Sequence, residues 1–262
     1  MLNKLKSKIR KQQRLKREQQ VSAFVKKYIA ENNLSDLLRS ANEKSQSTGT
    51  DISHYVLLHS LIRKQKPSFV LECGTGKSTW VLAEALKKNH EEFGIKGKVI
   101  SMENIPEWYE QAQSIFPGYL KPFAEIHYSP SSTYLHCFVK GTTYENVPDN
   151  PYEIVFVDGP GYTIEENGRQ NITANMDFIK LLSSSKVPMT AVLDYRLTSV
   201  IAYAILLGKK NVQFLKPWNA GIVENVTQSD LIDQSTPNYA ANIELLQKVA
   251  EFKNADPSWI TL

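Results

Sequence analysis

The chain has 262 residues, 42% hydrophobic and 22% charged, a composition typical of a folded domain and not of a disordered or fibrous protein. This length suits one α/β domain with an appendage, and no apolar run reaches the roughly 18 residues that a membrane-spanning helix needs. The net charge of +4 is uneven, because residues 1–30 hold ten Lys or Arg against one acid, Glu18, so this segment carries +9 and the remainder −5. A mildly acidic body does not favour binding of a specific nucleic acid.

Residues 2–30 contain no Gly or Pro, and Leu2, Leu5 and Ile9 recur at helical spacing, which predicts one or two amphipathic helices. We expect this basic segment to pack on the body or on a partner protein. Attachment to an anionic membrane surface or a polyanion is the alternative. The polar residues 40–51 predict a linker or mobile loop. The expected division is therefore a basic helical extension with linker, 1–48, and a single domain, 49–262.

Strands and helices are expected to alternate along that domain. The expected strands are 69–72, 99–103, 124–128, 154–158 and 190–194, and the expected helices are 52–66, 78–88, 106–115, 131–139, 176–184 and 199–207. Residues 212–215 and 221–226 flank a turn and predict an antiparallel pair, and a last helix is expected near 242–252. This order indicates an α/β, Rossmann-like doubly wound sheet of seven strands with a C-terminal antiparallel hairpin.

Residues 69–79 (FVLECGTGKST) join a short apolar strand to a carboxylate, two glycines and a helix start. This layout predicts a nucleotide-type ligand site at the carboxyl edge of the first strand. The Gly-Lys-Ser letters at 76–78 also match the end of a phosphate-binding P-loop, so a nucleotide-dependent phosphotransferase is one alternative. That pattern requires a glycine where the chain has Leu71, and the carboxylate of Glu72 would repel phosphates.

An acid, Glu103, ends the second expected strand, where it can hydrogen-bond both hydroxyls of a ribose. Together with Glu72-x-Gly-x-Gly76, the apolar strand that ends at Asp158 and the closing hairpin, it makes residues 52–226 resemble the class I S-adenosylmethionine-dependent methyltransferases. The resemblance implies S-adenosylmethionine as the cofactor. The cofactor contacts that it implies are Glu72, Gly74, Thr75, Gly76, Ser78, Glu103, Asn104, Ile105 and Asp158.

Methyl transfer to a hydroxyl needs positioning and removal of a proton. Asp158 and Asp194, at the ends of the fourth and fifth strands, are the candidate catalytic groups, and His127 is a lesser candidate base. The two aspartates resemble the pair that holds a divalent metal in catechol-type O-methyltransferases. Those enzymes have an Asn where this chain has Tyr195, so no metal is expected.

Residues 157–162 (VDGPGY) resemble a loop of the glucuronoxylan O-methyltransferases, which methylate a hydroxyl of a uronic acid. The expected acceptor is therefore a hydroxyl of a sugar, a glycan or a small metabolite. The predicted substrate contacts are Tyr162, Arg169, Tyr195 and Arg196. The other alternative is a non-catalytic scaffold of the same fold that acts through its basic helix.

The chain has only two cysteines, Cys73 and Cys137, in unrelated sequence contexts. Because such sparse cysteines are typical of a reducing compartment, we expect a cytoplasmic protein. It would be peripheral to the membrane if residues 1–30 attach to lipid.

Overall fold

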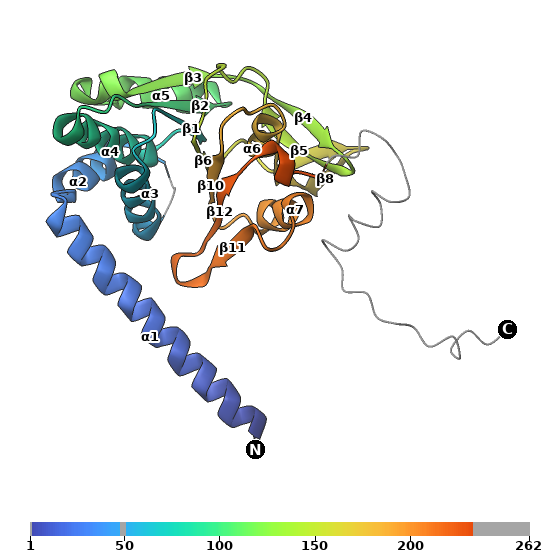
Figure 1. The fold of residues 1–262 in the computed structure, drawn as a ribbon. Coiled ribbons are helices and arrows are strands. Elements are labelled where there is room, and N and C mark those ends of the chain that lie inside the picture. The colour runs from blue at the N-terminus through green and yellow to red at the C-terminus, as the bar shows by residue number, and fades with distance from the viewer. Residues whose placement is uncertain (1, 48–50, 233–262) are drawn as a thin grey trace.

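A computed structural model describes residues 2–47 and 51–232, with the side chains of 2–10 and 14 left out (Figure 1). The helices are α1 (Leu2–Glu31), α2 (Ser35–Lys44), α3 (Ile52–Gln65), α4 (Lys77–Phe93), α5 (Pro106–Ile115), α6 (Asp177–Leu182) and α7 (Leu197–Leu207), with short 3-10 turns η1 (Gly118–Phe123), η2 (Lys216–Trp218) and η3 (Gln228–Asp230). The strands are β1 (Phe69–Cys73), β2 (Lys98–Glu103), β3 (Ala124–Tyr128), β4 (Ser131–His136), β5 (Val139–Tyr144), β6 (Ile154–Val157), β7 (Thr163–Glu166), β8 (Arg169–Ile172), β9 (Ala174–Asn175), β10 (Met189–Leu193), β11 (Val212–Leu215) and β12 (Ala220–Val226). Within these ranges no helix is long and apolar enough to cross a membrane.

Seven strands form the main sheet in the order β11-β12-β10-β6-β1-β2-β3. The five from β10 to β3 run parallel, whereas β12 is antiparallel to both of its neighbours. The expected Rossmann-like doubly wound sheet with a C-terminal antiparallel hairpin is thus confirmed. The chain moves outward from β1 to β3 and then returns to β6 on the other side of β1. Ligands of such sheets bind where the strand order reverses, here beyond the carboxyl ends of β1 and β6.

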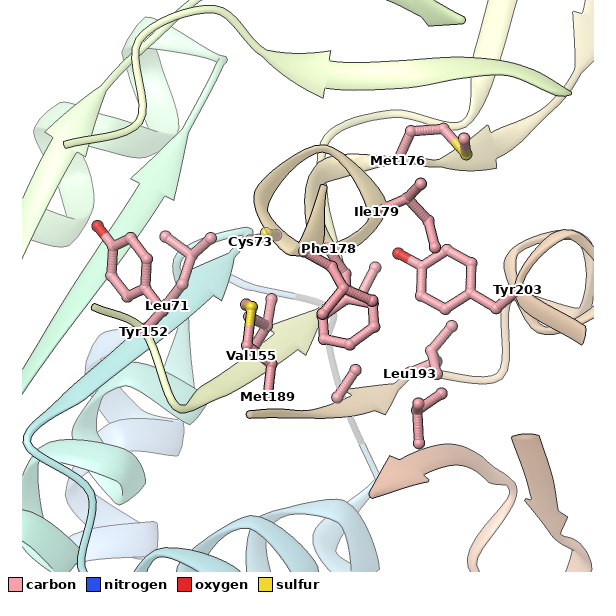
Figure 2. Close-up of a cluster of buried hydrophobic side chains, with 14 of the residues drawn as sticks. Leu71, Cys73, Tyr152, Val155, Met176, Phe178, Ile179, Met189, Leu193 and Tyr203 are labelled. Atoms are coloured by element: carbon pink, nitrogen blue, oxygen red, sulfur yellow. The ribbon is translucent and has the colours of Figure 1, made fainter. Parts of the chain in front are cut away.

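Helices cover both faces of the sheet: α2 to α5 lie on one side, and α6 and α7 lie on the other (Figure 1). Each face of the sheet forms its own core: the first lies under α2 to α5 and the second under α6 and α7. Successive side chains of a strand point to opposite faces, so Val70 packs into the first core and Leu71 into the second. In the second core, Phe178 of α6 stacks on Tyr203 of α7 with ring centroids 5.6 Å apart, above the sheet residue Val155 (Figure 2). Because both faces are covered, the polar ends of the strands remain as the place for a site.

The basic N-terminal segment forms one helix, α1, whose first turns extend away from the sheet (Figure 1). The helix ends where Asn33 takes a left-handed conformation (φ 51°) and the backbone N–H of Leu34 donates to the carbonyl of Ile29 at 3.0 Å. This cap turns the chain, and Leu34 is buried in the same core cluster as residues of α2, α3 and α4. The second half of α1 also contacts the body, since Phe24 packs edge-on against Trp218 of η2.

Helix α2 belongs to the core of the domain. Its apolar side chains Leu37, Leu38 and Ala41 are buried in the same cluster as residues of the sheet. The prediction of a linker from residue 40 was wrong for residues 40–44, because the Leu and Ala residues outweigh the polar ones on the face that meets α4.

The helix expected over 131–139 was also wrong, because these residues form β4 and the turn into β5. Along β4, exposed and half-buried side chains alternate, which is the period of a strand and not of a helix. A second hairpin, β7–β8, was not predicted. Its turn residues Asn167 and Gly168 both have positive φ (53° and 72°), as an Asn-Gly type I′ turn requires. The expected helix near 242–252 lies outside the described residues.

The burial of Leu34 predicts that Leu34→Ala lowers the free energy of unfolding by about 3 kcal/mol, because the truncated side chain leaves a cavity in the core cluster to which α2 and α4 contribute. Leu15→Ala on α1 is the matched control, since Leu15 is 48% exposed and should cost less than about 0.5 kcal/mol. Urea unfolding of the two variants measures both values. Equal stabilities would show that α2 is not part of the cooperative domain.

Candidate functional site

The carboxylate of Glu72 lies beneath the loop that joins β1 to α4. Its Oε2 accepts hydrogen bonds from the hydroxyls of Thr79 (2.5 Å) and Ser101 (2.6 Å), and Glu72 is fully buried. The Thr79 oxygen also accepts the N–H of Gly76 at 3.1 Å, which caps α4. Burial raises the pKa of Glu72 to about 7, against the hydrogen bonds of Ser101, Ser78 and Thr79. Through Thr79, Glu72 therefore fixes the loop between β1 and α4.

The ends of β1 and β6 approach each other at Gly74. Its φ of +98° is strained for other residues, and an added Cβ would lie 3.1 Å from the backbone carbon of Asp158. The backbone N–H of Asp158 donates to the carbonyl of Cys73 at 2.9 Å, and that of Gly74 donates to Met102 at 3.0 Å. Backbone hydrogen bonds thus fix the ends of β2, β1 and β6 relative to one another.

A cavity of about 380 Å³ opens above these strand ends, within the size range of small-molecule sites. The chain segments after β1, β2, β6 and β10 line it, together with Ser47 and Tyr144. Its lining residues are Ser47, Gly74, Thr75, Glu103, Asn104, Ile105, Trp108, Tyr144, Asp158, Gly159, Pro160, Gly161, Tyr162, Asp194, Tyr195 and Arg196. Three of these are acidic and one, Arg196, is basic, so the cavity favours a cationic ligand over an anionic one.

The carboxylate of Glu103 lines the cavity and is held by backbone amides. Its Oε1 accepts the backbone N–H groups of Asn104 (2.8 Å) and Ile105 (3.0 Å), which fixes the side chain. Burial raises the pKa of Glu103, although these two amides and that of Thr75 oppose the shift. A carboxylate held in this way can accept hydrogen bonds from a pair of ligand hydroxyls.

Asp158 and Asp194 lie next to each other at the ends of β6 and β10. Burial raises the pKa of Asp158 to about 7, and the neighbouring charge of Asp194 adds to this shift, whereas Arg196 opposes it. Asp158 also shares a side-chain hydrogen bond with Asp194, so at neutral pH it is only partly ionised. This is the state in which a carboxyl group can take up a proton and release it again.

Arg196 binds the chain itself. Its guanidinium donates to the backbone carbonyls of Asp158 and Pro160 and to Oδ1 of Asn175, and its Nη2 lies 3.4 Å from Oδ1 of Asp158. The ring of Tyr162 lies 5.0 Å from the guanidinium carbon. Arg196 thus fixes the loop after β6, and much of its capacity to bind a separate acidic substrate is already used.

The cavity brings together many, but not all, of the residues predicted from the sequence. Of the predicted cofactor contacts, Gly74, Thr75, Glu103, Asn104, Ile105 and Asp158 line it, and of the other predicted residues, Asp194, Tyr162, Tyr195 and Arg196 do. Glu72, Gly76, Ser78, His127 and Arg169 do not line it. His127 lies on β3, where its Nε2 is 3.3 Å from Glu125, and Arg169 is exposed on β8.

Sequence reasoning missed two residues that the fold brings to this region. Tyr144, from β5, lines the cavity and donates its hydroxyl to the carbonyl of Met102 at 3.1 Å. His54, from α3, is buried behind Asp194, with Nδ1 3.3 Å from its Oδ1. Neither residue belongs to a motif, and no spacing in the sequence relates His54 to β10.

Within the described ranges, no three His, Cys, Asp or Glu side chains are grouped so that they could hold a metal ion. The side chain that follows Asp194 is Tyr195, 59% exposed, and the cation Arg196 lies 3.4 Å from Asp158.

No protein-family model and no curated protein matches this chain. Among solved structures, it is similar to an SAH-bound methyltransferase of Podospora anserina, with 15% identity, a TM-score of 0.45 and coverage of 71% of this chain and 70% of that one. It is also similar to the O-methyltransferase TomG of Streptomyces achromogenes (20% identity, TM-score 0.39, coverage 66% and 67%) and to an O-methyltransferase of Bacillus cereus (17% identity, TM-score 0.38, coverage 69% and 70%). What this chain binds has to be argued from its own residues.

The buried carboxyl groups predict how stability depends on pH. Burial raises the pKa values of Glu72, Asp158 and Asp177 to about 7, whereas such groups titrate near 4 in an unfolded chain. Between these values the folded protein binds more protons than the unfolded one, so the free energy of unfolding falls as pH rises from about 4 to about 7. Each group contributes about 1 kcal/mol per pH unit within this range.

Glu72→Gln removes one of these groups and retains an acceptor for Thr79 and Ser101. We expect the free energy of unfolding of this variant to fall less steeply with rising pH than that of wild type, as measured by urea unfolding at pH 5, 6, 7 and 8. Glu125→Gln is the control, because the hydrogen bond from Lys98 lowers the pKa of this exposed carboxyl and keeps it ionised over the whole range. Parallel curves for wild type and Glu72→Gln would show that Glu72 is ionised throughout.

Proposed function

We propose that the protein is an S-adenosylmethionine-dependent methyltransferase that methylates a hydroxyl of a sugar, a glycan or a small metabolite. The observation that carries this proposal is the acidic cavity at the point where the strand order reverses. Glu103, Asp158 and Asp194 contribute three carboxylates to it, and its single basic residue, Arg196, is bound to the chain. Such a site suits a ligand with a ribose and positive charges, and it disfavours a ligand with phosphates.

The residues present fit this cofactor. Glu103 would hold the ribose hydroxyls, and the backbone of Gly74 and Thr75 would lie against the amino-acid part, since Gly74 has no Cβ to keep a ligand away. Ile105 and Trp108, 42% and 36% exposed, offer apolar surface beside Glu103 for the adenine. When bound, the cofactor supplies a methyl group on a positively charged sulfur.

Asp158 would remove the proton of the acceptor hydroxyl. Its raised pKa, about 7, leaves an ionised fraction at neutral pH that accepts a proton more readily than an ordinary carboxylate does. Arg196 fixes the residue through its backbone carbonyl and lies near its Oδ1, so the carboxylate is already oriented before the acceptor binds.

The acceptor would lie against Tyr162 and Tyr195. These aromatic side chains line the cavity and are 40% and 59% exposed. Aromatic surface next to carboxylates suits the apolar faces and the hydroxyls of a sugar ring. Because Arg196 is bound to the chain and two acids lie nearby, we propose a neutral acceptor in preference to an acidic one.

A phosphotransferase that uses the Gly-Lys-Ser letters finds little support. Ser78 is buried, the N–H of Gly76 is bonded to Thr79, and Lys77 does not line the cavity. A non-catalytic scaffold of the same fold would bind the cofactor and show no turnover.

Calorimetry with S-adenosylhomocysteine and, separately, with ATP tests the cofactor. We expect Glu103→Ala to weaken binding of S-adenosylhomocysteine by about 10- to 100-fold, because the ribose loses a charged acceptor. Glu107→Ala, an exposed residue in the first turn of α5 that does not line the cavity, should bind as wild type. Binding of ATP without binding of S-adenosylhomocysteine would overturn the methyltransferase proposal.

Transfer of a radiolabelled methyl group to a panel of neutral sugars, uronic acids and small phenols tests the reaction. Asp158→Asn should lower turnover by about 100-fold or more while S-adenosylhomocysteine still binds, because the variant cannot accept a proton. Asp149→Asn, an exposed residue outside the cavity, is the control. An Asp158→Asn variant with normal turnover would exclude Asp158 as the base, and cofactor binding without turnover on any acceptor would support the scaffold alternative.

A further inference from the structure

The imidazole of His54 is buried between two groups that restrict its protonation. It is 1% exposed, its Nε2 lies 2.7 Å from the backbone carbonyl of Trp218, and its Nδ1 lies 3.3 Å from Oδ1 of Asp194. A carbonyl oxygen can only accept, so Nε2 carries a hydrogen and donates it. Nδ1 is then the atom at which His54 gains or loses its proton.

Nδ1 of His54 and Oδ1 of Asp194 face each other in a closed space. Both atoms are buried, and apart from each other neither has a hydrogen-bond partner among the described residues. Two buried polar atoms in this position are stabilised by a proton between them. Because Nε2 already carries a hydrogen, this proton makes the pair either an imidazolium with a carboxylate or a neutral imidazole with a carboxylic acid.

The charges around His54 favour the first of these forms. Asp194 faces it from the end of β10, and Asp51 lies just before α3, so both ionisable groups that act on it are acidic. Burial lowers the pKa of His54, but the hydrogen bond and charge of Asp194, the Trp218 carbonyl and Asp51 together raise it above its ordinary value. An imidazolium at His54 would be a buried positive charge next to Asp194, at the wall of the cavity.

Two neighbouring carboxylates resist ionisation together unless a positive charge is close. Arg196 lies 3.4 Å from Oδ1 of Asp158, whereas His54 lies 3.3 Å from Oδ1 of Asp194. We propose that His54 is a positioning residue: it holds Asp194 as an oriented carboxylate and supplies the positive charge that allows Asp158 to ionise beside it. This inference rests on the proposed function for its catalytic meaning, but the pairing itself can be measured without turnover.

In the alternative, His54 only links α3 to η2 through its hydrogen bond to Trp218. Two substitutions of His54 distinguish this link from the positioning of Asp194. The amide of Asn can replace Nδ1–H, so His54→Asn retains a donor to Asp194 without the charge. The amide of Gln can reach the position of Nε2–H, so His54→Gln retains only the hydrogen bond to Trp218. His59→Gln is the matched control, because His59 is equally buried on α3 but its Nδ1 contacts the hydroxyl of Tyr28 at 2.9 Å, away from the cavity.

The decisive experiment is an NMR titration of full-length protein with ¹³C-labelled His and Asp side chains, after a thermal melt has shown that each variant is folded. We expect His54 to be protonated at pH 7 in wild type and to lose that proton at lower pH in Asp194→Asn. The titration of Asp158 should move to higher pH by about one unit in His54→Asn and His54→Gln, and it should not move in His59→Gln. A neutral His54 at pH 7, or an Asp158 titration that is the same in all variants, would falsify the proposal.

If transfer activity is found, comparing the turnover of His54→Asn with that of His54→Gln gives an independent test. Positioning predicts that turnover falls by about tenfold in His54→Asn and further in His54→Gln, with unchanged affinity for S-adenosylhomocysteine. A tether to Trp218 predicts the reverse order, and this result would overturn the positioning role. If wild type transfers no methyl group, the proposed function fails while the NMR titration still decides whether His54 and Asp194 share a proton.

Discussion

The close approach of β1 to β6 is the constraint on which the site depends. Gly74 can meet the backbone of Asp158 only because it lacks a Cβ and accepts a positive φ, and backbone hydrogen bonds then join both strand ends to β2. The floor of the cavity is therefore made of main chain, which side-chain motion does not disturb. Glu103 and Asp158 follow strands that are already fixed, so their carboxylates have defined places before any ligand binds.

The carboxylates in and below the cavity would repel one another, and each is stabilised by its own hydrogen-bond donor or cation. Backbone amides hold Glu103, the guanidinium of Arg196 lies beside Asp158, and the imidazole of His54 faces Asp194. Below the loop, two hydroxyls bind Glu72. These partners come from strand β2 and the loop after it, the segment after β10, helix α3 and the start of α4. The acidic character of the cavity is thus distributed over the fold, and because Asp158 and Asp194 are neighbours, removing the partner of one should also affect the other.

The sequence predicted site residues correctly where a short apolar run ends in a polar residue. Such a run is a buried strand, and the residue at its carboxyl end lies at the edge of the sheet where ligands bind. Glu103 and Asp158 were found in this way. The helix predicted over 131–139 was wrong because these residues form a strand that pairs with β5 across a hairpin, and an alternation of side chains with a period of two residues would have predicted that strand. The Asn-Gly pair at 167–168 is typical of a two-residue hairpin turn, and the sequence analysis did not use it. His54 could not be found, because only the fold brings α3 behind β10.

The β7–β8 hairpin has a consequence for how such a protein changes over evolution. Within the described chain its strands form a separate two-stranded sheet that pairs with neither the main sheet nor β4–β5–β9, although it begins directly after Tyr162 at the cavity. A segment attached in this way can be lengthened, shortened or exchanged without disturbing the strands that hold the acids. Under the proposed function, exchange of this one segment would change the surface next to Tyr162 and leave Glu103, Asp158 and Asp194 in place.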